Sequence, residues 1–297
     1  MPALRLAYRS PFAVEPLFGF LGDRAIPGVE TFDGATLRRS IHLHHGSAGV
    51  IELTPHRSRP HIALRVDLDD PTDVRGAADA ARRLLDLDAD PIAIDDALSE
   101  DPALRPLVRA RPGVRVPGAV DGFELAVRAV LGQQVSVRAA RTMAGRLVAL
   151  AGPALPPEQR ADGITHLFPS AGQVASVSLD GLGLTGRRAA TLRQLSERVA
   201  GGNLDLSGNG DPEVVVDGLL TIPGIGPWTA AYVSMRALRD PDAFPATDLG
   251  IRAGMAELGL PTTPAAILER AERWRPWRGY AAMHLWMGVP QPDGSSP

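Results

Sequence analysis

A glycine-rich turn is the segment of this sequence whose residue types most directly suggest a chemical use. Residues 223–226 read Pro-Gly-Ile-Gly, and they lie between an apolar segment and Pro227. Proline suits the first turn of a helix, and glycines let the main chain approach a phosphate closely, with the first amides of the helix facing the anion. The N–H groups of Gly224, Gly226 and Thr229 are therefore expected to bind a nucleic-acid backbone. A similar turn also joins many helices that bind nothing.

Asp248 is the candidate catalytic carboxylate. It follows Trp228 by 20 residues, which is enough for one helix and a loop that returns the chain to the turn. Thr247 is expected to cap the next helix, and this places Asp248 at the helix start. An acidic residue there often does no more than balance the helix dipole, so the case for catalysis depends on the neighbouring turn.

Two absent residue types exclude several kinds of site. The 297 residues include no Cys, which excludes disulfides, Cys-ligated zinc, iron–sulfur clusters and a Cys nucleophile. All 31 Lys and Arg residues are Arg, so no side chain can form a Schiff base. The net charge of -3 does not decide whether nucleic acid binds, because a local patch of Arg can bind phosphate in a neutral protein.

The first third of the chain has the pattern of a sheet with helices. Alternating apolar residues predict strands at residues 3–8, 40–45, 49–54 and 61–67. Helical spacing of apolar residues predicts helices at residues 14–25 and 73–87. We expect an antiparallel sheet with helices on one face.

Helices dominate after residue 95. Arg-Pro-Gly at 111–113 and Pro-Gly at 117–118 indicate a linker, and residues 151–163 form a connection rich in Pro and Gly. Apolar spacing predicts helices at residues 123–131, 137–151, 187–201, 212–220, 228–238, 248–258, 264–274 and 278–287.

The turn, the Pro-Trp-Thr-Ala that follows it and the distal Asp together resemble the helix-hairpin-helix DNA glycosylase superfamily. Within it, the chain resembles the bacterial 3-methyladenine DNA glycosylase II (AlkA) family over most of its length. Five segments carry the likeness: residues 17–21 (Leu-Phe-Gly-Phe-Leu), 111–118, 126–133 with 135–136, 271–281, and 284–286 (His-Leu-Trp).

The resemblance implies an α+β fold. A TATA-binding-protein-like α/β domain is expected at residues 1–97. A helical domain with the hairpin is expected at 121–240, and a second helical domain at 98–120 and 241–290. The active cleft then lies between the two helical domains.

The resemblance also implies a monofunctional DNA glycosylase of base excision repair. Its partner is double-stranded DNA with alkylated bases, and its target base is flipped out of the helix. Alkylation gives a purine a positive charge and makes it a good leaving group, so a single carboxylate beside the sugar, Asp248, suffices. With no apolar run of roughly 18 residues and no secretory signal, we expect a cytoplasmic, nucleoid-associated monomer.

Motif positions within the family suggest further site residues. An aromatic pocket for a cationic base is expected from Phe20, Trp228, Tyr232 and Trp286, each of which could instead be a core residue. Either Gln134 or Val135 is expected to enter the base stack as a wedge. Leu249 and Gly250 differ from the bulkier Tyr-Leu pair of some relatives, which leaves the base preference open.

No cofactor is expected for catalysis, but the resemblance implies a structural Na⁺ or K⁺ at the hairpin. The carbonyls of Leu220, Ile222 and Ile225 are the expected ligands. His42, His44 and His45 lie together in the sequence, but no Cys or acidic residue follows at ligand spacing, so we do not expect a metal site there.

Three alternatives remain at this stage. An oxoguanine-type glycosylase/lyase needs a nucleophilic Lys near the hairpin, and residues 221–231 contain none. A non-enzymatic module for binding damaged DNA needs only the hairpin. The third is a fragment of a larger adaptive-response protein that also has a methyl-acceptor domain. The absence of Cys shows only that this chain does not contain the acceptor.

Overall fold

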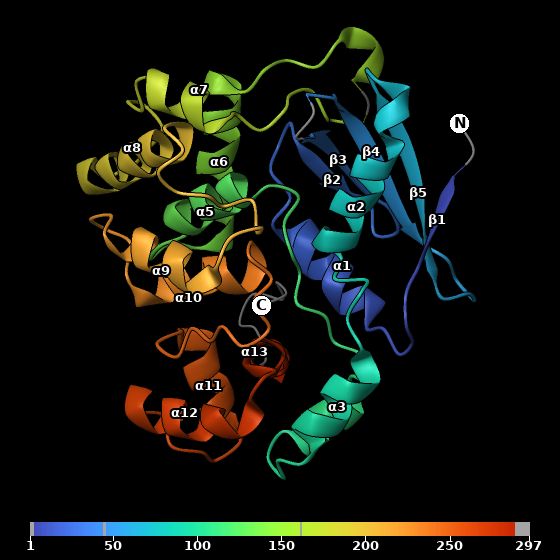
Figure 1. Cartoon of the computed structure of the whole chain (residues 1–297), viewed down its shortest axis with the longest axis vertical. Helices are drawn as coiled ribbons and strands as arrows, with labels where there is room; N and C mark the ends of the chain where they lie inside the picture. Colours follow the sequence, from blue (N-terminus) through green and yellow to red (C-terminus); the bar gives the residue numbers. More distant parts are fainter. Residues whose placement is uncertain (1–2, 44–45, 161, 289–297) are drawn as a thin grey trace.

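The computed structural model describes residues 3–43, 46–160 and 162–288 of the chain (Figure 1). Its N-terminal part is a five-stranded sheet with the order β1-β5-β4-β3-β2, in which every neighbouring pair is antiparallel. The strands are β1 (Leu4–Ala7), β2 (Glu30–Phe32), β3 (Leu37–His42), β4 (Ala48–Pro55) and β5 (His61–Leu68).

The two faces of the sheet have different partners because side chains alternate along each strand. Ile51 of β4 packs with helices α1 (Val14–Asp23) and α2 (Val74–Leu84) in one buried core. The neighbouring Val50 packs on the other side, with Leu155 and Ile164 of a long connection between helices. The expected antiparallel sheet with helices on one face is confirmed.

Two details of the sheet differ from the sequence prediction. The three residues of β2 were missed, since they are too few to show an alternating pattern. Strand β3 begins at Leu37 and not at Ser40, so its pairing with β2 was missed as well. His44 and His45 lie outside the described residues.

The rest of the chain is helical. Its helices are α3 (Pro91–Ser99), α4 (Arg105–Ala110), α5 (Gly122–Leu131), α6 (Val137–Ala151), α7 (Ala171–Ser176), α8 (Gly186–Ala200), α9 (Pro212–Leu220), α10 (Pro227–Arg236), α11 (Leu249–Glu257), α12 (Pro264–Ala271) and α13 (Arg278–Gly288). Short 3₁₀ turns lie at Pro71–Asp73, Pro157–Gln159 and Glu272–Trp274. Among the described helices, none is long and apolar enough to cross a membrane.

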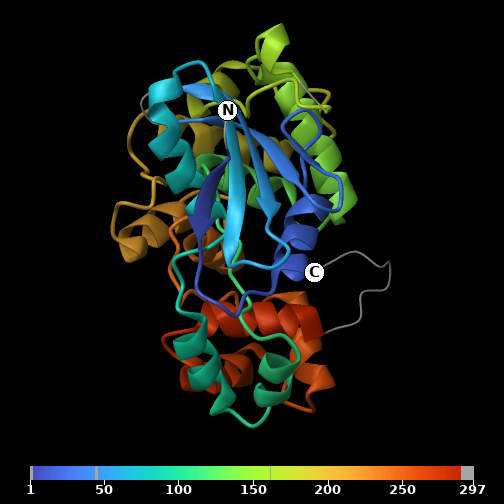
Figure 2. The ribbon, with the colours of Figure 1, turned by 90° about the vertical axis from the view of Figure 1, so that its right-hand side faces the viewer.

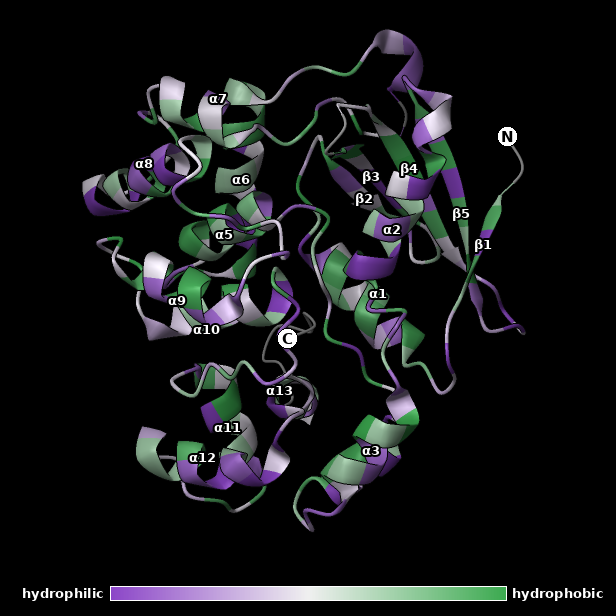
Figure 3. Cartoon of the chain, viewed as in Figure 1, coloured by the Kyte–Doolittle hydropathy of each residue, from purple (hydrophilic) through white to green (hydrophobic). Residues whose placement is uncertain are grey.

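These helices form two separate cores. One contains residues of α5, α6, α8, α9 and α10, and α5 at its centre is largely apolar (Figure 3). The other contains residues of α3, α4, α11 and α13 and lies at one end of the molecule, below the sheet in Figures 1 and 2. Helices α3, α4 and α7 were not predicted. The expected domain boundary at residue 97 falls inside α3, whose Ile94 and Leu98 both pack in this second core.

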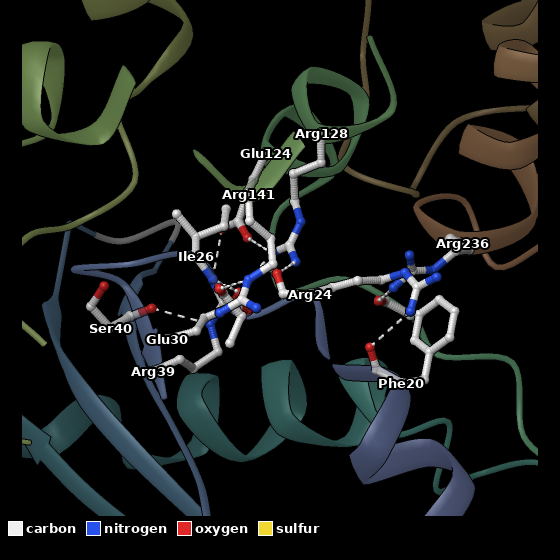
Figure 4. Close-up of polar contacts among 12 residues, drawn as sticks. Phe20, Arg24, Ile26, Glu30, Arg39, Ser40, Glu124, Arg128, Arg141 and Arg236 are labelled. Atoms are coloured by element: carbon white, nitrogen blue, oxygen red, sulfur yellow. Dashed lines mark hydrogen bonds and ion pairs between the residues drawn. The ribbon is translucent and has the colours of Figure 1, made fainter. Parts of the chain in front are cut away.

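A buried ionic network joins the sheet to α5 (Figure 4). Arg39 of β3 contacts Glu30 of β2 at 2.8 Å and Glu124 of α5 at 2.7 Å. Arg128 contacts the same two carboxylates at 2.8 and 3.0 Å. Burial raises the pKa of Glu30, but Arg128 and Arg39 outweigh it and the net shift is downward. The four charges therefore balance, and removing one member would leave one uncompensated charge in a buried network.

This network also holds the chain after α1. One Arg128 nitrogen donates to the carbonyl of Arg24 at 2.6 Å, and Arg141 Nε donates to the carbonyl of Ala25 at 2.9 Å. The main-chain N–H of Ile26 donates to Glu30 at 3.0 Å. The N-terminal domain thereby places α1 and the loop after it against the helical part.

Candidate active site and DNA interface

A cavity of about 300 Å³ opens where the sheet domain and both helical cores meet. Its walls come from α1 and the loop after it, α5, α6, α10, α11 and α13. The lining residues are Phe20, Arg24, Ile26, Arg128, Ala129, Gly132, Val135, Val137, Ala140, Arg141, Ala144, Trp228, Tyr232, Arg236, Asp248, Gly250 and Trp286. Among these described residues Asp248 is the sole carboxylate, and all four residues expected in the base pocket are present.

Asp248 is itself the N-cap of α11. Its Oδ1 accepts the main-chain N–H groups of Gly250 at 2.7 Å and Ile251 at 3.0 Å. The expectation that Thr247 caps this helix was wrong, because Thr247 lies exposed one residue before the cap. The N-cap geometry leaves Asp248 half-buried at the cavity wall with a fixed side-chain direction.

Two indole groups also bind this carboxylate. Trp228 Nε1 of α10 donates to Asp248 Oδ2 at 2.6 Å, and Trp286 Nε1 of α13 donates to Oδ1 at 2.7 Å. Sequence reasoning selected both Trp residues for their ring faces, and the sequence holds no signal for these N–H bonds. With four N–H donors on two oxygens, the negative charge is held in one place.

The aromatic residues differ in how much ring surface they expose to the cavity. The rings of Trp228 and Tyr232 stack with 5.2 Å between centroids at 12°, and Tyr232 and Trp286 are 6.4 Å apart at 53°. Trp228 and Tyr232 are half-buried, so part of each ring remains open. Phe20 lines the cavity but is only 2% exposed.

Two arginines that sequence reasoning missed lie against these rings. The guanidinium carbon of Arg24 is 3.9 Å from the Phe20 centroid, and that of Arg236 is 4.9 Å from it (Figure 4). Arg236 also donates to the Tyr232 hydroxyl and to the carbonyl of Pro117. The spacing of four residues between Tyr232 and Arg236 on a helix was an available signal.

The arginines make this wall positive. Burial lowers the pKa of Arg24 to about 10, so its side chain stays charged at neutral pH. Burial raises the pKa of Tyr232, but Arg236 and Arg24 outweigh burial and the net shift is downward. The cavity therefore has a carboxylate on one wall and guanidinium groups on another.

The hairpin expected to bind DNA joins α9 to α10. Gly224 has φ +95, and an added Cβ there would meet Thr191 Oγ1 at 2.1 Å, so Gly224 is required for the turn itself. Gly226 is the N-cap of α10, and an added Cβ there would meet nothing within 4 Å. The first helical amides, Thr229 included, have no partner within the helix, so they are suited to bind an anion.

The expected wedge lies at the end of α5 and is tied to this hairpin. Gln133 Nε2 donates to the Gly224 carbonyl at 2.9 Å and to Thr229 Oγ1 at 3.0 Å. Gln134 next to it is exposed and has φ +55, whereas Val135 is half-buried and packs on the first helical core. Gln133 was not among the expected site residues, although it ends the segment 126–133, which carries part of the family likeness.

The carbonyls expected to hold a cation lie in the same hairpin. Leu220 is the last residue of α9, where carbonyls have no partner within the helix. The Ile222 carbonyl accepts the N–H of Ile225 at 3.0 Å and keeps a second lone pair. Among the described residues, no group of His, Asp or Glu side chains could hold a metal ion.

Comparison with known proteins agrees with this architecture. The family model described as the AlkA N-terminal domain matches residues 3–121, and that of the HhH-GPD superfamily base excision DNA repair protein matches residues 127–279. The 3-methyladenine DNA-glycosylase from Archaeoglobus fulgidus has a similar fold, with a TM-score of 0.83 at 22% identity over 95% of this chain and 97% of that one.

Two curated relatives match by sequence over nearly the whole chain. The probable bifunctional transcriptional activator/DNA repair enzyme AlkA of Mycobacterium tuberculosis is 45% identical over 99% of this chain, which spans 58% of that protein's length. DNA-3-methyladenine glycosylase 2 of Escherichia coli is 35% identical over 95% of each chain. The chain belongs to the HhH-GPD superfamily of base excision DNA repair proteins and, within it, to the AlkA-type DNA-3-methyladenine glycosylase family.

Proposed function

We propose that this protein excises alkylated purine bases from duplex DNA by hydrolysing the N-glycosidic bond, with Asp248 as the catalytic carboxylate. The observation that carries the proposal is a carboxylate held by two indoles on the wall of a base-sized cavity, at the N-cap of α11, the next helix after α10. The volume is at the lower end of the roughly 300–1,000 Å³ found for ligand pockets, which suits one flipped base. The names of the sequence relatives support the same activity.

The reaction needs little more than a fixed negative charge. When the bond from the sugar C1′ breaks, its electron pair moves to the alkylated base, which leaves neutral, and the sugar gains positive charge. Asp248 stabilises that charge, and water then adds to C1′ with loss of a proton. Because four N–H groups already bind its oxygens, Asp248 acts mainly as this fixed charge and less as a proton acceptor.

The proposed preference for alkylated bases rests on the leaving group. Trp228 and Tyr232 offer ring faces that attract a cation, but Arg24 and Arg236 on the same cavity repel one. Charge attraction by the wall therefore does not select a cationic base. Selection follows from the weaker glycosidic bond of an alkylated purine.

The proposed contacts with duplex DNA come from the hairpin and from the end of α5. Amides of Gly224, Gly226 and Thr229 bind phosphate without reading sequence. A Na⁺ or K⁺ on the carbonyls of the hairpin would add positive charge beside that phosphate. Exposed Gln134 is the better wedge of the two candidates, since Val135 packs on the protein core.

Asp248→Asn tests the catalytic role. Asn keeps the shape of the side chain but loses the charge that acts in the transition state. We expect release of free bases from methylated DNA to fall by about 100-fold or more, with binding to abasic-analogue DNA nearly unchanged. Near-normal release by the variant would refute the assignment, and a wild-type protein that binds damaged DNA but releases no base would favour a binding module.

We also propose that the protein has no lyase activity. Strand cleavage by a glycosylase/lyase passes through an imine between an amine and the sugar C1′, and this chain has no Lys. Arg stays protonated and cannot replace it. Incubation with lesion-containing duplex and borohydride should therefore give no covalent adduct on a denaturing gel. An adduct that persists after the N-terminal amine is blocked would contradict the proposal.

A further inference from the structure

Helices α11 and α13 approach each other closely at two glycines of α11. An added Cβ on Gly254 would lie 2.6 Å from the main-chain carbonyl of Leu285. One turn earlier, an added Cβ on Gly250 would lie 2.8 Å from Trp286 Cδ1 and 3.2 Å from Trp286 Nε1. Gly250 and Gly254 are four residues apart, so both face α13. The space beside Gly250 is therefore filled by the Trp286 indole.

The position of this indole decides whether it reaches Asp248. Trp286 Nε1 donates to Asp248 Oδ1 at 2.7 Å, and the same oxygen accepts the N–H of Gly250 itself. An added Cβ on Gly250 would also lie 3.1 Å from Asp248 Oδ1. A side chain at position 250 would therefore crowd both the donor and the acceptor of this bond.

We infer that Gly250 is a positioning residue for the proposed catalytic carboxylate, because its missing side chain leaves the space in which Trp286 reaches Asp248. This rests on the proposed role of Asp248. Gly250 has no φ in the left-handed region and lies in the first turn of a helix, so backbone conformation does not require glycine there. Ala favours helices by about 1 kcal/mol over Gly. In this chain the glycine makes room for the neighbouring indole, and the helix itself does not need a glycine there.

Gly250→Ala is the test, and Gly172→Ala is its matched control. Gly172 is likewise the second residue of a helix, after the N-cap Ser170, and an added Cβ there meets nothing within 4 Å. We expect single-turnover base release by Gly250→Ala to fall about tenfold, with unchanged binding to abasic-analogue DNA. The ¹⁵N–¹H resonance of the Trp286 indole, assigned by its loss in Trp286→Phe, should shift in Gly250→Ala. Gly172→Ala should change neither the rate nor the resonance.

Trp286→Phe supplies the second part of the test, since Phe cannot donate to Asp248 and its smaller ring fills less of the space beside Gly250. In that background we expect Gly250→Ala to change the rate by less than about twofold, so the two substitutions are strongly coupled. Equal losses in both backgrounds, or an unshifted indole resonance in Gly250→Ala, would overturn the inference. All of these outcomes assume that the wild-type protein releases bases. If the wild-type protein released none, the proposed function itself would be refuted.

Discussion

Asp248 receives its hydrogen bonds from residues of three helices: Trp228 of α10, Trp286 of α13 and the first amides of α11. A carboxylate held in this way cannot rotate to follow a changing charge, so in the proposed reaction Asp248 is oriented before the bond breaks. Such preorganised charge stabilises a transition state without a reorganisation cost at the moment of reaction. Each donor should therefore affect rate more than affinity.

Trp228→Phe isolates one of these donors. Phe keeps an aromatic ring beside Tyr232 but has no N–H for Asp248 Oδ2. We expect single-turnover base release to fall by about tenfold, with little change in binding to abasic-analogue DNA. Trp277→Phe is the control, because Trp277 lies outside the cavity and contacts Tyr280. Unchanged release by Trp228→Phe would show that the indole N–H is dispensable.

The positions of the site residues could be predicted from motif spacing, but their hydrogen bonds could not. The four aromatic candidates and Asp248 all line one cavity, as expected. The bonds to Asp248 join residues 20 and 38 positions apart in the chain, and side-chain direction over such separations depends on helix packing. Arg24 and Arg236 were missed because an Arg is usually read as a surface residue.

At the scale of elements, local signals identified most helices and missed three short ones, α3, α4 and α7. Helix α10 begins at Pro227 as the turn predicts, since Pro-Gly-Ile-Gly is a local pattern. Helices α3 and α4 are short and adjoin Pro and Arg residues that suggested a linker. Helix α3 nevertheless carries local signals that were overlooked, because Pro91, Ile94 and Leu98 have helical spacing and Asp90 caps the helix.

The hairpin gives an element-scale prediction. Gly226 has φ -105 and ψ 178, which Ala also adopts, and an added methyl would point into the open space where a phosphate is expected. Gly226→Ala should fold normally and weaken binding to undamaged and damaged duplexes by the same factor, on the order of tenfold (about 1.4 kcal/mol). Fluorescence anisotropy with both duplexes measures this. A loss confined to damaged DNA would contradict the assignment of Gly226 to the phosphate contact.

On the scale of the whole molecule, the cavity forms where three cores meet. Phe20 and Arg24 reach it from the N-terminal domain, and the network of Glu30, Arg39, Glu124 and Arg128 fixes that domain against α5. Composition and periodicity predict the sheet and the helices but contain no signal for ion pairs between residues 9 to 98 positions apart. The arrangement of the domains was expected only through resemblance to a family.

A second junction between domains contains a carboxyl group that should make stability depend on pH. Asp86 follows α2, accepts a hydrogen bond from the Tyr280 hydroxyl of α13 at 2.7 Å and contacts the N–H of Val116 in the linker at 3.4 Å. Burial raises the pKa of Asp86 to about 6, with the Tyr280 hydroxyl and Arg115 opposing it. The same carboxyl in the unfolded chain titrates near about 3.9.

Asp86→Asn should therefore stabilise the protein at neutral pH more than at acidic pH. As pH rises from about 4 to 6, the unfolded chain loses the Asp86 proton before the folded protein does, so the wild type loses stability through that window and the loss stays constant above it. Asn also accepts from Tyr280 and tolerates φ +50, so the backbone effect is the same at every pH. Thermal unfolding at pH 4.5 and 7.5 should show the variant gaining roughly 4–8 °C more at pH 7.5, the shift expected for about 2 kcal/mol. An equal gain at both pH values would show that Asp86 ionises freely in the folded protein.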